Sequence, residues 1–133
     1  MRSELMDKLT MRFPFLPAYL EIENGWYDLI HELCEEIEKR LYNKKHDFNV
    51  EQVKQKYGSL SFYTNIYEDN NLYNNLIELI DYYEEKSKTV CEFCGSDGKR
   101  FCQNYWINII CEKCSAIRDK KRIDINNAYD NLA

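Results

Sequence analysis

Apolar residues recur at helical spacing in two long stretches of the chain, with charged residues between them. The first stretch predicts an amphipathic helix over about residues 25–42, with Asn24 as its N-cap. The second predicts a helix that starts after an N-cap among residues 69–71 and ends near Ser87. The apolar positions are Trp26, Leu29, Ile30, Leu33, Cys34, Ile37 and Leu41 in the first helix, and Leu72, Leu76, Leu79, Ile80 and Tyr83 in the second. These two helices are expected to build most of the core.

Residues 48–65 follow a different pattern, which predicts two strands joined by a turn near Tyr57-Gly58. The second strand alternates between an apolar face and a more polar face, as expected when one face of a strand is buried. In the first strand Val50 and Val53 do not alternate, so a bulge or a short helix is an open alternative there. The segment is expected to form a small β-hairpin beside the helices.

The two ends of the chain carry weaker patterns. Residues 3–12 are expected to form a short helix capped by Ser3, and Pro14 and Pro17 bring this helix to an end. Residues 121–132 are expected to form a last, weakly amphipathic helix.

Five of the six cysteines lie in the stretch CEFCGSDGKRFCQNYWINIICEKC. Cys91 and Cys94 form one C-x2-C pair, and sixteen residues separate it from the second pair, Cys111 and Cys114. This spacing is typical of a four-thiolate zinc site, because two residues between thiols let one tight turn direct both sulfurs at one ion. The insert between the pairs is long enough for a small hairpin, which is the layout of a zinc ribbon.

Other chemistry fits this stretch less well. A disulfide scaffold suits a secreted protein, and the N-terminal residues lack the apolar core of a secretion signal. A redox C-x-x-C motif usually lies in a thioredoxin-like unit, and here there are two pairs. Four cysteines fill the coordination shell and leave no position for a reacting water, so one structural zinc ion is expected. Cys102 is expected to be a strand residue, and Cys34 a small core residue.

Together these patterns predict an α+β fold: two main helices with a small β-hairpin, followed by a C-terminal zinc ribbon. The predicted domains are residues 1–87, a helical α+β core, and residues 88–133, the zinc ribbon with a short C-terminal helix. Such a ribbon is too small to bury much apolar surface alone, so the metal is expected to supply its folding energy.

Charge is unevenly distributed over the two predicted domains. The formal net charge is -5, with 17 acidic against 10 basic residues in residues 1–87 and 6 against 8 in residues 88–133. The first part should repel nucleic-acid phosphates, and only the second can attract them. No apolar run approaches the roughly 20 residues of a membrane-spanning helix, so no membrane partner is expected. Because the N-terminal residues also lack the apolar core of a secretion signal, an intracellular protein is expected.

The motifs of several enzyme classes are incomplete in this chain. The stretch HELCE at His31–Glu35 begins like the metalloprotease motif H-E-x-x-H, but Glu35 stands where the second histidine is required. The H-x-E and P-C-x-x-C elements of zinc deaminases are missing. His31 and His46 both lie far from the cysteine pairs, where a zinc-supported nuclease needs its histidines. The chain is therefore not expected to be an enzyme.

Several segments, in this order, resemble a family of small phage and prophage proteins with a C-terminal four-cysteine zinc ribbon. They are GWYDLIHELCEEIEK from Gly25, VKQKYGSLSFY from Val53 to Tyr63, a second helix, and then CEFCG and CEKC. The resemblance covers about residues 13–115. It implies a phage-borne accessory protein in the cytoplasm of a bacterial host, and it brings no catalytic residues.

The expected function is binding of a host or phage protein, for example as an inhibitor of a host-defence system such as an anti-CRISPR. An alternative is nucleic-acid binding through the ribbon, with basic residues on phosphates and aromatic rings stacked on bases. A third hypothesis, an acidic mimic of nucleic acid, rests on the excess of acidic residues in residues 1–87. The candidate binding residues are Lys99, Arg100, Tyr105, Trp106, Lys113 and Arg118.

Overall fold

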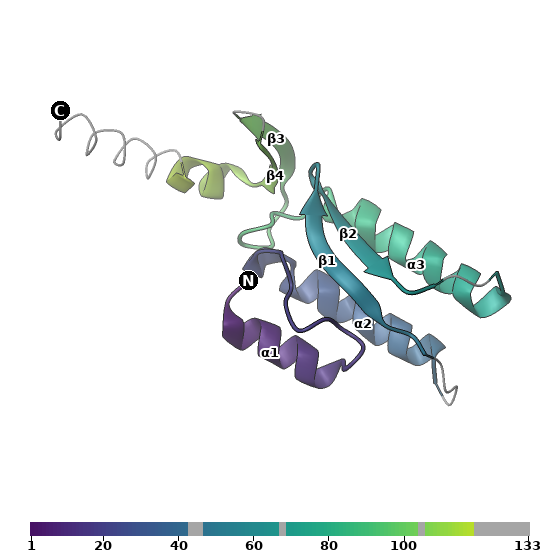
Figure 1. Ribbon diagram of the computed structural model, residues 1–133. Helices are drawn as coiled ribbons and strands as arrows, with labels where there is room; N and C mark the ends of the chain where they lie inside the picture. Colours follow the sequence, from purple (N-terminus) through teal and green to yellow (C-terminus); the bar gives the residue numbers. More distant parts are fainter. Residues whose placement is uncertain (43–46, 67–68, 104–105, 119–133) are drawn as a thin grey trace.

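The computed structural model describes residues 1–42, 47–66, 69–103 and 106–118 (Figure 1). Its elements are α1 (Ser3–Arg12), the 3-10 turn η1 (Asn24–Trp26), α2 (Tyr27–Arg40), β1 (Val50–Lys56), β2 (Ser59–Thr64), α3 (Asn71–Ser87), β3 (Lys99–Gln103) and β4 (Trp106–Ile110). A further short helix covers residues 112–118. The described part of residues 1–87 is called the body below, and residues 88–118 are called the ribbon.

The body is an α+β unit in which β1 and β2 form an antiparallel hairpin, α3 packs against β2, and α2 packs against α3 (Figure 1). The segment after α1 lies beside α2, where the rings of Phe13 and His31 meet with 5.3 Å between their centroids. The core includes the fully buried Trp26, Leu33 and Leu76. The two long amphipathic helices and the hairpin predicted from the periodicity are therefore confirmed.

The β1–β2 hairpin ends in a two-residue turn at the predicted place. Lys56 pairs with Ser59, and Tyr57 and Gly58 between them have positive φ angles of 52° and 81°. Positive φ at both central residues is the type I′ geometry, whose twist matches that of the flanking strands.

Strand β1 contains an irregularity that explains its unusual sequence pattern. The pairing register shifts between Val50 and Gln52, so Val50 and Val53 are both buried although they do not alternate. The alternative of a short helix is wrong, and the strand with a bulge is confirmed. On the other edge of β1, the Val53 carbonyl accepts a hydrogen bond from the Glu21 N–H at 2.9 Å.

Side chains of α3 cover the outer edge of β2. The Ser87 hydroxyl accepts a hydrogen bond from the Leu60 N–H at 2.8 Å, and the Glu84 carboxylate accepts one from the Phe62 N–H at 2.9 Å. An unpaired strand edge is a template for pairing with another chain. In β2, these contacts give two backbone N–H groups of the edge a hydrogen-bond partner within the molecule.

Two of the predicted helix caps are wrong, and one is confirmed. Helix α1 begins at Ser3 itself, so Arg2 occupies the N-cap position, without a side-chain cap. Asn24 lies in η1, and its Oδ1 accepts a hydrogen bond from the Arg2 N–H at 2.8 Å. The Asn24 side chain is therefore not the N-cap of α2, and α2 begins directly after the 3-10 turn η1. Asn70 is the N-cap of α3, and its side chain accepts the backbone N–H three residues on.

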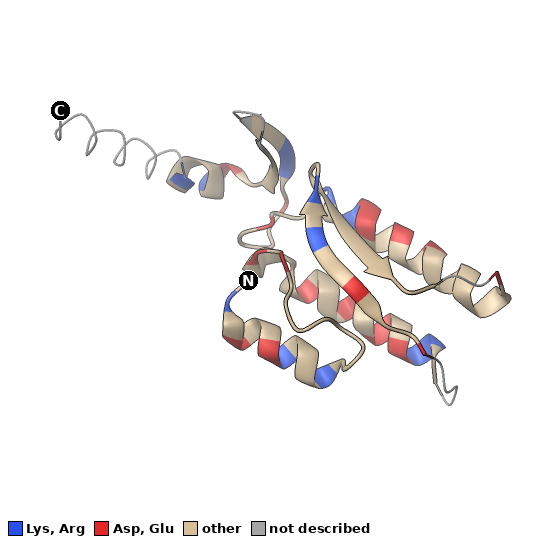
Figure 2. Cartoon of the chain, viewed as in Figure 1, with Lys and Arg blue, Asp and Glu red and all other residues tan. Residues whose placement is uncertain are grey.

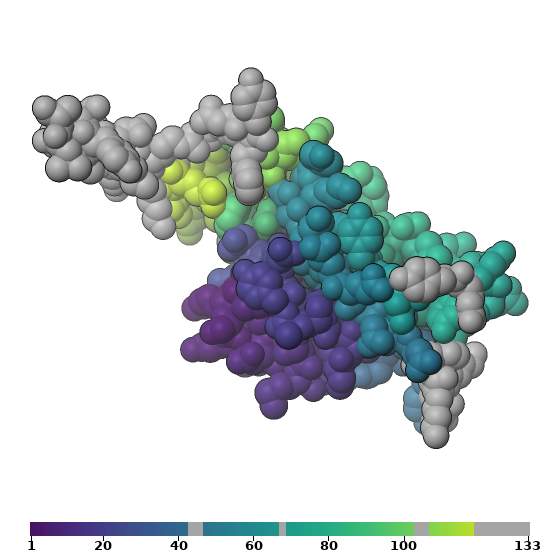
Figure 3. All heavy atoms as spheres, in the orientation of Figure 1, coloured from purple at the N-terminus to yellow at the C-terminus, as the bar shows by residue number. Residues whose placement is uncertain are grey.

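The ribbon lies at one end of the body (Figures 1 and 3). Strands β3 and β4 form an antiparallel hairpin between the two cysteine pairs, in register from Lys99 with Ile110 onward. Ile109 of β4 is fully buried and belongs to the same core as the body. The C-terminal zinc-ribbon layout is therefore confirmed. The helix predicted over residues 121–132 lies outside the described residues, and the predicted division into two domains stays a prediction.

Candidate metal centre

The four cysteines of the two C-x2-C pairs come together in the ribbon. The sulfur atoms of Cys91, Cys94, Cys111 and Cys114 all lie within 4.8 Å of one another. Those of Cys94 and Cys111 are 3.6 Å apart. Around a tetrahedral zinc ion with Zn–S bonds of about 2.3 Å, two sulfurs are about 3.8 Å apart. The cluster can therefore hold one metal ion, as the sequence spacing predicts.

The first cysteine pair lies in a tight turn that follows α3. The Cys91 N–H donates to the Ser96 carbonyl at 2.7 Å, and the Gly95 N–H donates to the Cys91 carbonyl at 2.9 Å. Gly95 has a φ of 82°, in the left-handed region that a residue without a side chain adopts readily. This turn brings the sulfurs of Cys91 and Cys94 within 4.8 Å of each other.

The second cysteine pair lies where β4 passes into the helix of residues 112–118. The Cys114 N–H points at the Cys111 sulfur at 3.4 Å, and the Ser115 N–H donates to the Cys111 carbonyl at 2.9 Å. Backbone N–H groups directed at a ligand sulfur spread the charge of a metal-bound thiolate. The start of the helix therefore places the second pair and directs a backbone N–H at the Cys111 sulfur.

The four thiols differ in exposure and in acidity. Cys91 is fully buried, Cys94 is exposed, and the other two are half-buried. Hydrogen bonds from Ser96 lower the pKa of the Cys94 thiol to about 6. Partial burial, with hydrogen bonds among the neighbouring thiols, raises the pKa of Cys114 well above its ordinary value. A bound cation favours the thiolate form, so metal binding offsets the cost of ionising Cys114.

This donor set defines a closed site. Thiolate ligands favour soft metal ions and are consistent with zinc. With four positions taken by cysteine, no position is left for a water or a substrate, so the cluster suits a structural metal. The other two cysteines lie outside it: Cys102 is exposed on β3, and Cys34 is buried in the core, where burial raises the pKa of its thiol.

The turn that holds Cys91 also joins the ribbon to the body. The Trp26 indole N–H donates to the Val90 carbonyl at 2.9 Å, and the Gly25 N–H donates to the Glu92 carbonyl at 2.8 Å. A methyl group added to Gly25 would lie 2.2 Å from the Cys91 carbonyl oxygen, which is too close for any side chain. The metal centre is thereby held against η1, directly before α2.

Glu92 is a feature of this region that the sequence did not indicate. It is 5% exposed, and its Oε2 has no hydrogen-bond partner among the described residues. Burial raises the pKa of the Glu92 carboxyl to about 7, and the nearby Glu23 carboxylate acts in the same direction. A glutamate between two cysteines of a tight turn is expected to face solvent. Here the Glu92 side chain is buried, and its backbone carbonyl accepts the Gly25 N–H from the body.

A groove of about 1170 Å³ on the ribbon is lined by residues of β3 and of the helix over residues 112–118. Every ligand cysteine except Cys91 contributes to its wall. Phe101 and Ile117 line it and keep 43% and 47% of their surfaces exposed. Large exposed apolar side chains in a concave surface are typical of a binding site.

Three of the predicted binding residues, Lys99, Arg100 and Lys113, line this groove. Figure 2 shows basic residues on β3 and on the helix after β4. Ile110 and Ile117 also line the groove, and their contribution was not predicted. The helix over residues 112–118 was not expected from the sequence. Its residues line the groove together with those of β3.

The remaining predicted binding residues are placed only in part. The Arg118 guanidinium lies 4.3 Å from the centroid of the Phe93 ring, a stacked contact within the ribbon. Tyr105 lies outside the described residues, and so does the side chain of Trp106. The structure therefore brings three of the four predicted basic residues to the groove and leaves the aromatic part of the set as a prediction.

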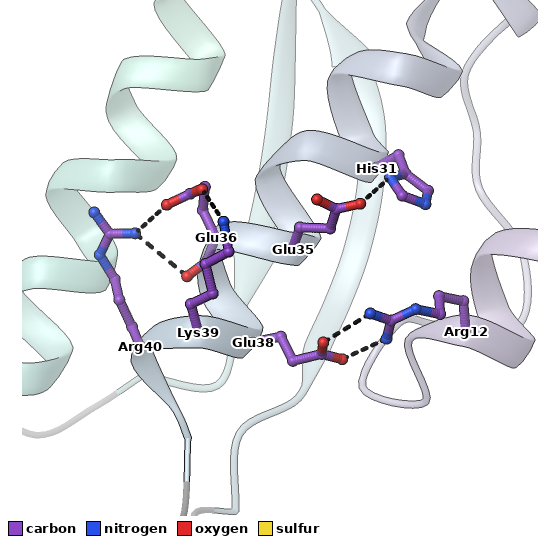
Figure 4. Close-up of polar contacts among 7 residues, drawn as sticks. All are labelled: Arg12, His31, Glu35, Glu36, Glu38, Lys39 and Arg40. Carbon is purple, nitrogen blue, oxygen red and sulfur yellow. Dashed lines mark hydrogen bonds and ion pairs between the residues drawn. The ribbon is translucent and has the colours of Figure 1, made fainter.

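Acidic side chains on α2 are engaged in internal ion pairs (Figure 4). The Arg12 guanidinium bonds both carboxylate oxygens of Glu38, at 2.5 and 2.8 Å. Glu36 contacts Lys39 and Arg40, each at 3.1 Å. Exposed ion pairs of this kind add little to stability, but the cations neutralise part of the negative charge of the α2 carboxylates. The body therefore offers less free negative charge to a mimic of nucleic acid than its composition indicates.

No protein-family model, curated protein or solved structure matches the chain. Among the described residues, no helix combines the length and the apolar character needed to cross a membrane. The resemblance to phage proteins therefore stays a prediction.

Proposed function

We propose that this chain is a metal-stabilised protein-binding module, and that the groove on the ribbon binds a partner segment with apolar and acidic side chains. The observation that carries this proposal is the groove itself, in which Phe101 and Ile117 are exposed beside cationic side chains. An apolar concave surface with a few directed polar groups is the usual form of a binding site.

The charges of the groove favour an acidic partner. Within the described residues, Lys99, Arg100 and Lys113 form no ion pair, whereas four cations of the body are paired with carboxylates. An unpaired surface cation can engage a partner carboxylate without first losing an internal contact. Asp97 and Glu112 also line the groove, so we expect a few directed charge contacts and no broadly positive field.

The metal has a structural role in this proposal, with one zinc ion per chain. Three of its four ligands also line the groove, so the bonds that close the metal site fix one wall of the binding surface. A ribbon of this size buries little apolar surface, and a metal ion then supplies much of the folding energy. Removal of the metal should therefore abolish partner binding.

The resemblance to small phage proteins supports an accessory role inside a bacterial host. Accessory proteins of that kind often act by occupying a host protein. We therefore propose host-defence complexes, including CRISPR nucleases, as the first partners to examine, with the chain acting as an inhibitor.

Nucleic-acid binding is the second candidate function. It is favoured by the exposed ring of Phe101 beside Lys99 and Arg100, since a ring among cations can stack on a base. Asp97 and Glu112 in the same groove oppose phosphate binding, and the thiolate ligands add negative charge. A protein partner therefore ranks first.

Affinity capture from a bacterial lysate, with the full zinc-loaded chain as bait, tests the proposal. Two groove variants, Phe101→Ser and the double variant Lys99→Glu with Lys113→Glu, remove the apolar and the charged contacts separately. The control is Lys8→Glu, which changes an exposed cation on α1. We expect one host protein to be captured by the wild type and the control and lost from both groove variants, with metal content unchanged.

A host protein captured equally by all four forms would show that the groove is not the binding surface. A parallel titration uses single-stranded DNA at increasing salt. DNA binding that falls steeply with salt, and that the double charge variant removes, would replace the protein partner with a nucleic acid.

A further inference from the structure

We propose that Cys94 is an oxidation site, and that hydrogen peroxide links it to Cys111 in a disulfide that releases the metal ion. The inference rests on the proposed function in one respect only: release of the ion would also switch off the groove. The unequal exposure of the ligand thiols, the short distance between two of them, and the anchoring of a third carry the proposal.

Oxidants in solution reach the four ligands unequally. Cys94 is exposed and lines the groove, whereas Cys91 is fully buried where the ribbon meets the body. Oxidation of cysteine follows the accessibility of its thiolate. Peroxide should therefore attack Cys94 first and leave Cys91 untouched.

The proposed reaction has two steps, and Cys111 takes part in the second. In the first step the Cys94 thiolate attacks the peroxide, so an S–O bond forms and the O–O bond breaks. The leaving hydroxide takes up a proton and becomes water. The sulfur of Cys111 lies 3.6 Å from that of Cys94. Its thiolate then attacks the sulfenic sulfur, an S–S bond forms, the S–O bond breaks, and a second hydroxide takes up a proton. Each sulfur has lost one electron, and the ion has lost two ligands.

The turn around Cys91 has attachments to the body that do not depend on the ion. The Gly25 N–H bonds the Glu92 carbonyl, and the Trp26 indole bonds the Val90 carbonyl. Release of the ion should therefore loosen the groove side of the centre and leave the body folded. Reduction of the disulfide with zinc present should restore the site, which makes the reaction a reversible switch.

Cys102 supplies a matched control within the same ribbon. It is exposed on β3 but is not among the four clustered sulfurs. A reaction governed by exposure alone would use Cys102 as readily as Cys94. A reaction directed by the cluster would use Cys94 with Cys111.

The test treats the full zinc-loaded chain with hydrogen peroxide, follows free zinc with a chromogenic chelator, and maps disulfides by mass spectrometry after alkylation. We expect a peptide linking Cys94 to Cys111 to form in step with zinc release, Cys91 to remain reduced, and Cys102→Ser to release zinc at the wild-type rate. Dithiothreitol with added zinc should return the metal.

Retention of zinc, release of zinc without this disulfide, a main product that links Cys94 to Cys102, or markedly slower release from Cys102→Ser would each overturn the inference. All of these readouts are independent of a binding partner. Failure of the groove to bind a protein would therefore leave them unchanged, and the two proposals can fail separately.

Discussion

Gly25 sets how closely the body approaches the metal centre. An alanine methyl group there would lie 2.2 Å from the Cys91 carbonyl oxygen and 2.6 Å from the carbonyl carbon of Glu92. Because both neighbours are backbone atoms, we expect Gly25→Ala to lower the free energy of unfolding by about 1–3 kcal/mol in urea titrations. The control Glu78→Ala, at an exposed site on α3, should stay within about 0.5 kcal/mol of the wild type. A Gly25→Ala protein as stable as the wild type would contradict the described junction.

Ser87 is a second residue whose role depends on a single hydroxyl. It is fully buried, accepts the Leu60 N–H at 2.8 Å and donates to the Glu84 carbonyl at 2.5 Å. Ser87→Ala leaves the Leu60 N–H buried without a partner, which should cost about 1–3 kcal/mol of unfolding free energy. Thr89 makes a similar bond to the Lys86 carbonyl but is exposed. Thr89→Ala should therefore cost clearly less, and equal losses would refute this role for Ser87.

The contact between α3 and the edge of β2 predicts that the stability of the protein depends on pH. Burial raises the pKa of Glu84 above its ordinary value of 4.5, and Asp81 acts in the same direction, against the hydrogen bond from the Phe62 N–H. The folded protein then holds the proton more tightly than the unfolded chain. The contribution of Glu84 to the free energy of unfolding is therefore fully present below the pKa of the unfolded chain. It is lost as the pH rises through the higher pKa of the folded protein.

The variant Glu84→Gln isolates this effect, because its amide oxygen can still accept the Phe62 N–H and it carries no charge. We expect the unfolding free energy of the variant, relative to the wild type, to increase between pH 4 and pH 7 in urea titrations. Glu78→Gln on the same helix is the matched control. A relative stability of Glu84→Gln that is the same at both pH values would contradict the buried placement of this carboxyl.

The same elements show how far the sequence predicts the fold. The apolar stripes of α2 and α3 and the turn at Tyr57-Gly58 follow from local periodicity and turn chemistry, and they are confirmed. The predicted cap at Ser3 is wrong because α1 already begins at Ser3. The predicted cap at Asn24 is wrong because the Asn24 side chain accepts the backbone N–H of Arg2, a contact between residues distant in sequence. Contacts between residues distant in sequence, such as Ser87 with Leu60, leave no local pattern to read.

In the molecule as a whole, the cysteine cluster could be predicted from the sequence, whereas the surfaces around it could not. The two C-x2-C pairs predict the cluster because ligand spacing is set by the coordination geometry of one ion. Burial of Glu92 and the concave shape of the groove arise from how the ribbon meets the body and from the helix over residues 112–118. Those are properties of packing, which spacing does not encode.

We expect Cys91, Cys94, Cys111 and Cys114 together to hold one metal ion in this chain. The most direct test is the metal content of the purified protein, measured for the wild type and for the double variant Cys91→Ser with Cys111→Ser. Cys102→Ser, at an exposed cysteine outside the cluster, is the control. We expect close to one zinc ion per chain in the wild type and the control, and loss of zinc from the double variant. Undiminished zinc in the double variant would contradict this expectation.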